Sequence, residues 1–156
     1  DTKLHHFGSI KEESAMNSKT GHYSRLILKQ LEENPENARY NYQAGRMFLG
    51  KQDYRTALKY FEKTAKISPG YKLVFSEIAK IFLQMNEKKK AAGYFMKSVE
   101  YNPENPSPAN NLAVVCMSMG NFKEAKAILA GQLKKHPKNI ALRKNFEEAI
   151  RNLNKS

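Results

Sequence analysis

The sequence has no tryptophan and only one cysteine, Cys116. A single cysteine cannot close an internal disulfide, so the fold does not depend on a disulfide framework, and a reducing compartment is compatible with it. The sequence also lacks the run of about 18 apolar residues that a membrane helix requires, and it shows no signal-peptide pattern. We therefore expect a cytoplasmic location and no membrane insertion.

Catalytic patterns are absent from the sequence as well. It contains no nucleophile–base pairing, no glycine-rich phosphate loop and no pair of carboxylates at a useful spacing. His5 and His6 are adjacent and, with His22, suggest a metal site at first sight. Neighbouring residues point in different directions on any regular element, however, so we predict no metal, no cofactor and no enzymatic activity. Because the chain starts at Asp1 and not at Met, we expect a fragment or a processed product.

Basic residues outnumber acidic ones, and the formal net charge is +12. This excess has two interpretations: solvated helix faces, or attraction to an acidic partner, a membrane surface or nucleic acid. No aromatic residues are interleaved with the basic clusters, as a nucleic-acid platform would require. We therefore expect no nucleic-acid partner, and an electrostatic binder of nucleic acid or an anionic surface is the lesser alternative.

What the sequence does contain is a pattern that returns every 34 residues. The alanines at its centre are followed four residues later by large apolar residues, and each unit ends in a proline. The repeating positions are Ala57, Ala91 and Ala125; Phe61, Phe95 and Leu129; and Pro35, Pro69, Pro103 and Pro137. A 34-residue period with a small residue, an aromatic and a closing proline is typical of the tetratricopeptide repeat, or TPR. The residues that carry the resemblance in the first full unit are Gly45, Phe48, Tyr54, Ala57, Phe61 and Pro69.

The resemblance implies an all-α fold, a right-handed α-solenoid of antiparallel helix hairpins with a C-terminal capping helix. We expect an irregular leader at 1–19, the second helix of a degenerate repeat at 20–36, TPR units at 37–70, 71–104 and 105–138, and the cap at 139–156. The apolar periodicity and the turn signals predict helices at 22–34, 37–50, 54–67, 71–84, 88–101, 107–119, 122–135 and 140–153. Thr20 is the expected N-cap of the first of these helices.

Small residues mark the places where the paired helices approach each other. Gly45 is expected to face Ala57, and Ala79 is expected to face Ala91, because a bulky residue there would push the two backbones apart. Cys116 aligns with Phe48 and Phe82 in the repeat, so we expect it to be a buried core residue.

In TPR arrays the first helix of each hairpin lines a concave face. When this geometry is carried over, the expected partner-binding residues are Arg39, Tyr42, Gln43, Arg46, Leu73, Glu77, Lys80, Asn110, Asn111 and Val114. Leu49, Ser76, Leu83, Ser107 and Met117 occupy further positions of the same face. A mixture of an aromatic, amides and both charges suits an extended peptide, so we expect a protein–protein interaction module that binds a peptide or protein segment. Self-association is a second possible use of the face.

The TPR domains of chaperone adaptors hold a C-terminal carboxylate in a clamp of basic and amide side chains. The matching places here hold Tyr42, Arg46, Glu77, Ser107 and Asn111. Only Arg46 and Asn111 suit that chemistry, and the carboxylate of Glu77 opposes it. We therefore predict that the chain has no such clamp.

The N-terminal segment carries a second resemblance. His5-His6-Phe7-Gly8, a stretch of about ten residues, a helix and then Asn34-Pro35-Glu36-Asn37 are similar to the junction that leads into C-terminal TPR repeats in bacterial family 2 glycosyltransferases. This resemblance implies a nucleotide-sugar domain upstream of Asp1, with His5 or His6 near its metal or its sugar-nucleotide phosphate. The alternative function is therefore an accessory domain of a glycosyltransferase, which recruits the acceptor protein or drives self-association.

Overall fold

The computed structural model describes residues 19–155, and this part of the chain folds into eight α-helices without a strand. The helices are α1 (Lys19–Glu33), α2 (Ala38–Gly50), α3 (Tyr54–Ile67), α4 (Val74–Gln84), α5 (Lys88–Tyr101), α6 (Pro106–Ser118), α7 (Phe122–Lys135) and α8 (Ile140–Leu153). Among them, none has the length and apolar character needed to cross a membrane. The expected all-α architecture is confirmed.

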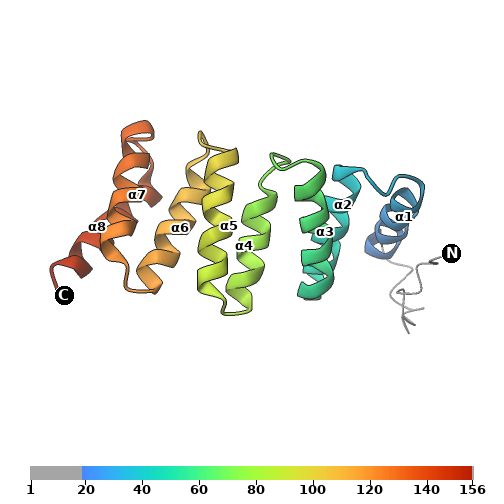
Figure 1. Cartoon of the computed structure of the whole chain (residues 1–156), viewed down its shortest axis with the longest axis horizontal. Helices are drawn as coiled ribbons and strands as arrows, with labels where there is room; N and C mark the ends of the chain where they lie inside the picture. Colours follow the sequence, from blue (N-terminus) through green and yellow to red (C-terminus); the bar gives the residue numbers. More distant parts are fainter. Residues whose placement is uncertain (1–18, 156) are drawn as a thin grey trace.

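The helices form a row of hairpins (Figure 1). Helix α2 packs against α3, α4 against α5, and α6 against α7, while α8 closes the row by packing against both α7 and α6. Helix α1 lies at the other end and packs against α2. The row therefore has the stacked-hairpin arrangement that the 34-residue period predicts.

Four helices have the predicted boundaries, and the others differ at their ends. The predictions 54–67, 88–101, 122–135 and 140–153 match α3, α5, α7 and α8. Helix α1 begins at Lys19, so the assignment of Thr20 as its N-cap is wrong: Thr20 lies within the helix. Helix α4 begins at Val74 and not at position 71.

The late start of α4 has a clear local cause. Asn37, Asn105 and Asn139 occupy one position of the repeat, and each caps the following helix by accepting a hydrogen bond from a backbone N–H, at 2.9 Å from Arg39, 2.9 Å from Ser107 and 3.1 Å from Leu142. Tyr71 occupies this position before α4 and cannot provide such a cap. Helix α4 has no side-chain cap, and the chain passes through Lys72 at a φ of +47° before the helix begins. The loop between α3 and α4 is therefore longer than the equivalent loops.

Small residues hold each hairpin together, as expected. Ala57, Ala91 and Ala125 are fully buried. A Cβ atom added to Gly45 would lie 2.8 Å from the ring of Phe61. The close approach at Gly45 is therefore confirmed, but the atoms that require it belong to Phe61, one turn beyond the predicted partner Ala57.

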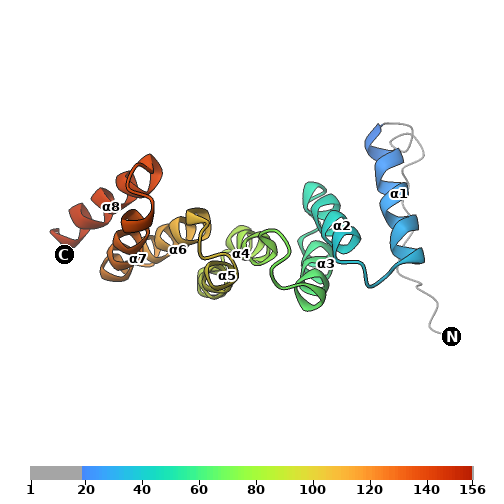
Figure 2. The ribbon, with the colours of Figure 1, turned by 90° about the horizontal axis from the view of Figure 1, so that it is seen from above.

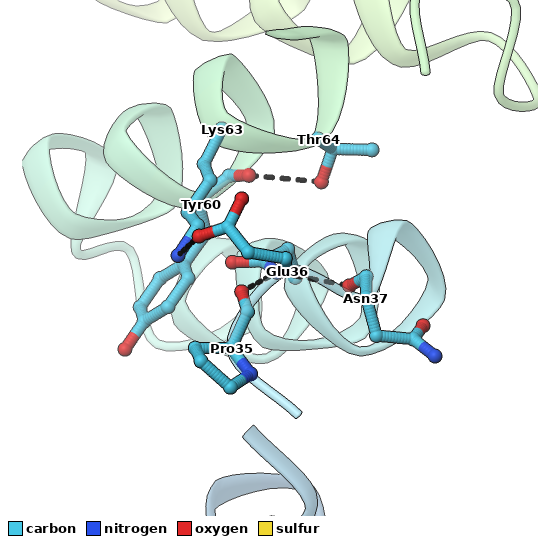
Figure 3. Close-up of polar contacts among 7 residues, drawn as sticks. Pro35, Glu36, Asn37, Tyr60, Lys63 and Thr64 are labelled. Atoms are coloured by element: carbon cyan, nitrogen blue, oxygen red, sulfur yellow. Dashed lines mark hydrogen bonds and ion pairs between the residues drawn. The ribbon is translucent and has the colours of Figure 1, made fainter. Parts of the chain in front are cut away.

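Polar contacts fix the loop between α1 and α2 onto the first hairpin (Figure 3). The amide of Asn41 donates hydrogen bonds to the carbonyl oxygens of Pro35, at 2.8 Å, and Asn37, at 2.9 Å. Lys63 of α3 forms an ion pair with Glu36 at 2.9 Å. The sequence pattern assigns no role to Asn41, because its position in the repeat is apolar at Phe75 and Ala109.

Only part of the apolar face predicted for α1 is buried. Ile27 and Leu31 pack with Ala44 of α2. Tyr23 and Leu26, in contrast, are 51% and 46% exposed. Tyr23 stands in the repeat position of Ala57, on the side that faces the first helix of a hairpin. Helix α1 therefore resembles the second helix of a hairpin, and among residues 19–155 no first helix precedes it.

Gly45, which is in close contact with a neighbouring ring, and Gly93, which has open space around it, provide a stability test. Gly45→Ala should lower the free energy of unfolding by about 1–2 kcal/mol, because the cost of forcing a methyl group into the ring of Phe61 exceeds the gain in helix propensity. Gly93→Ala is the matched control: Gly93 lies in α5 with open space around it, so this change should raise the free energy of unfolding by about 0.5–1 kcal/mol. Urea denaturation measures both values. Equal effects of the two substitutions would refute the close approach at Gly45.

Cys116 is 1% exposed, which confirms its expected place in the core. Burial raises the pKa of its thiol from 9.0 to about 11, and the nearby carboxylate of Glu124 adds to this shift. Because the thiolate is the reactive form, Cys116 should react with a disulfide reagent at pH 8 far more slowly in the native protein than in urea. Comparable rates in the two states would show that the thiol is accessible.

Candidate functional site

Nine of the ten residues predicted to bind a partner lie on the first helices of the hairpins. Arg39, Tyr42, Gln43 and Arg46 belong to α2, Glu77 and Lys80 to α4, and Asn110, Asn111 and Val114 to α6. Leu73 directly precedes α4, because that helix begins later than predicted. Viewed from above, α2 and α4 lie on the same side of α3 and α5 (Figure 2). We call the surface that these ten residues form the first-helix face.

The residues of the first-helix face differ in how accessible their side chains are to a partner. Arg39, Arg46, Lys80 and Val114 are exposed, and Gln43, Leu73, Asn110 and Asn111 are half-buried. Tyr42 and Glu77 are mostly buried, with 7% and 8% of their surface exposed. The expectation that Ser76 belongs to this face is wrong, because its hydroxyl is buried and bonds to that of Ser98 at 2.7 Å. Ser76 points into its own hairpin.

Tyr42 is the centre of an aromatic cluster. Its ring packs edge-on against Phe61 of α3 and against Tyr71 of the following loop, in both cases with 5.4 Å between the ring centroids. The ammonium group of Lys72 lies 5.2 Å from the centre of the Tyr42 ring and 5.8 Å from that of Tyr71. Both loop residues reach Tyr42 because helix α4 starts only after them.

Burial raises the pKa of the Tyr42 hydroxyl above its usual value of 10.0. The carboxylate of Glu77 raises this pKa further, while Arg46, which is hydrogen-bonded to the hydroxyl, lowers it in part. Tyr42 therefore stays a neutral phenol near neutral pH, and its hydroxyl keeps a proton to donate.

Two predicted residues are occupied by contacts within the chain. The carboxylate of Glu77 forms an ion pair with Lys80, one turn along α4, at 3.2 Å. The amide oxygen of Asn110 accepts a hydrogen bond from Asn145 of α8 at 2.8 Å. Asn110 thus connects α6 to the capping helix, a role that the sequence did not reveal.

A cavity of about 530 Å³ lies between α1, α2 and the loop before α4. Its walls are formed by Tyr23, Ser24, Tyr42, Gln43, Arg46, Met47, Gly50, Lys51 and Lys72. The cavity brings together three predicted residues, Tyr42, Gln43 and Arg46, whereas the predicted residues of α4 and α6 do not line it. Sequence reasoning missed Tyr23 and Lys72. The signal that was available for Lys72 is Tyr71, which replaces the capping asparagine of the other loops.

Within residues 19–155 no three His, Cys, Asp or Glu side chains are grouped so that they could hold a metal ion. His5 and His6, which the glycosyltransferase resemblance singles out, lie outside the described residues.

Solved structures with a similar fold were found by comparison. Two crystal structures of MamA superpose with TM-scores of 0.74 and 0.69, at 16% and 15% identity. The first match covers 86% of this chain and 74% of the solved chain, and the second covers 94% and 96%. The first TPR domain of Spaghetti (RPAP3), solved with the HSP90 peptide SRMEEVD, matches with a TM-score of 0.65 at 15% identity, covering 74% of this chain and 92% of that one. At such identities these matches show the fold alone.

Comparisons of the sequence itself bear more directly on family membership than the likeness in fold does. No curated protein matches the chain in sequence. Two family models, both described as tetratricopeptide repeat, match residues 38–71 and 89–146. Together they span more than half of the chain: the match at 38–71 covers α2 and α3, and the match at 89–146 runs from α5 into α8. The chain therefore belongs to the tetratricopeptide-repeat family.

Proposed function

We propose that the chain is a protein-interaction module that binds an extended peptide or protein segment along the first-helix face. The observation that carries this proposal is the composition of the face: exposed cations, half-buried amides and the exposed apolar side chain of Val114 occur together on α2, α4 and α6. Such a mixture can bind the backbone and the side chains of an extended segment at the same time. The RPAP3 domain solved with a peptide supports the proposal by analogy of fold.

The segment that we propose is an internal one, without a free C-terminal carboxylate. Glu77 lies in the middle of the face and places its carboxylate there, paired with Lys80 at 3.2 Å. Of the residues in clamp positions, Tyr42 is mostly buried, and only Arg46 and Asn111 suit a carboxylate. The absence of a C-terminal clamp stays a prediction.

Other expectations also remain predictions. They are the cytoplasmic location, self-association, the unit boundaries at 37–70, 71–104 and 105–138, and the two alternative functions. The glycosyltransferase alternative depends on residues before Lys19, and the electrostatic alternative on the charge of +12. The proposed role is binding and not catalysis.

The proposal can be tested by selecting short peptides against the protein from a display library in which every peptide is fused through its C-terminus. Val114→Arg should weaken the binding of the selected peptides by about tenfold or more, because it places a long cationic side chain at the exposed apolar position of the face. Met96→Arg is the matched control, since Met96 is 57% exposed on the second helix α5. The Met96→Arg variant should bind the selected peptides as tightly as the wild type does.

Fluorescence polarisation with labelled synthetic peptides gives both affinities, and thermal unfolding shows that both variants are folded. If the library yields no specific peptide, or if the two variants lose affinity equally, the first-helix face is not the binding surface.

A further inference from the structure

We propose that the cavity between α1, α2 and the loop before α4 is a pocket for an acidic side chain of the bound segment. This proposal rests on the proposed function and specifies the chemistry of the partner at one end of the first-helix face. The occupant is an Asp or Glu within a peptide, held by Arg46 and Lys72.

The cavity has the size and the charge for such a side chain. Its volume of about 530 Å³ lies within the range of roughly 300–1,000 Å³ that is common for ligand sites. Three of its nine lining residues are cationic, Arg46, Lys51 and Lys72, and none is acidic. Lys51 and Ser24 take part in other contacts, so Arg46 and Lys72 are the residues that would bind the carboxylate.

Lys72 is held at the cavity by its backbone and by two rings. Its φ of +47° lies in the left-handed region, which is unfavourable for a lysine. Its ammonium group lies near the faces of Tyr42 and Tyr71, at 5.2 and 5.8 Å from the ring centres, and such contacts are attractive for a cation. The ammonium is therefore positioned before any ligand arrives, which reduces the entropy lost on binding.

The positive charge of the pocket is not neutralised from within the described part of the chain. In residues 19–155 neither Arg46 nor Lys72 forms an ion pair. The acidic residue that acts on this cluster, Glu77, is 8% exposed and is paired with Lys80. A carboxylate that enters the cavity would supply the missing countercharge.

The remaining walls favour a peptide side chain over a more highly charged group. Arg46 can form two parallel hydrogen bonds with one carboxylate, and the neutral hydroxyl of Tyr42 is a further donor. Met47 and the half-exposed ring of Tyr23 provide apolar surface for the neighbouring parts of a peptide. Gln43 and Arg46 belong both to the cavity and to the first-helix face, so a segment bound to that face can place one side chain in the pocket.

The test uses the full chain and the peptides selected from the C-terminally fused library. We expect these peptides to be enriched in Asp or Glu at one position. In a synthetic, C-terminally amidated peptide, Glu→Gln or Asp→Asn at that position should weaken binding by about tenfold, because a charge-assisted hydrogen-bond pair is lost. The double variant Arg46→Gln and Lys72→Gln should bind the acidic and the amide peptide equally.

A matched control removes the same charge elsewhere. Lys59 and Lys126 are exposed on the second helices α3 and α7, so the double variant Lys59→Gln and Lys126→Gln should still discriminate between the two peptides. The pocket is refuted if the selected peptides show no acidic position, or if discrimination survives in the Arg46/Lys72 variant. Saturable binding of inorganic phosphate that requires Arg46 and Lys72, without acidic enrichment, would also overturn the proposal and indicate a phosphate site.

The outcomes separate this proposal from the one on which it rests. If the selected peptides lack an acidic position but bind the Val114→Arg variant more weakly, the first-helix face remains the proposed binding surface and the acidic pocket is refuted. A library that yields no specific peptide would refute both proposals.

Discussion

The structure depends on the close approach of two helices within each hairpin. Small residues on the first helix let the large residue of the second helix fill the space between them, and at Gly45 even a methyl group would meet the ring of Phe61 at 2.8 Å. The same combination of a small and a large residue recurs at a spacing of 34 residues, at Ala79 and Phe95 and at Ala113 and Leu129, and all four side chains are buried. The first helices α2, α4 and α6 then carry the residues of the candidate binding face.

Much of the fold could be predicted from the sequence, because its local signals agree with each other. The ends of α3, α5, α7 and α8 match their predictions, since a turn precedes each of these helices and a consistent apolar period runs through it. The start of α4 could not be obtained by aligning repeats, because the alignment assumes that each loop provides a cap. Tyr71 removes that cap, and its effect on the chain becomes visible only in three dimensions.

The candidate site was harder to predict, because side-chain direction depends on partners that a repeat alignment does not show. Ser76 and Tyr42 occupy equivalent positions, yet Ser76 bonds to Ser98 inside its hairpin while Tyr42 packs against Phe61 and Tyr71. The cavity beside Tyr42 is lined in part by Lys72, which belongs to the longer loop before α4. The place where the chain departs from its own repeat is thus also the place where Lys72 lines a cavity beside Tyr42.

We propose that a partner binds along α2, α4 and α6. The most direct measurement is a titration of the isotope-labelled chain with a selected peptide, followed by NMR chemical shifts of the backbone amides. The chemical-shift changes should concentrate on α2, α4 and α6, with the largest near Arg46 and Lys72. Shifts concentrated on α3, α5 and α7, with the first helices unchanged, would contradict this proposal.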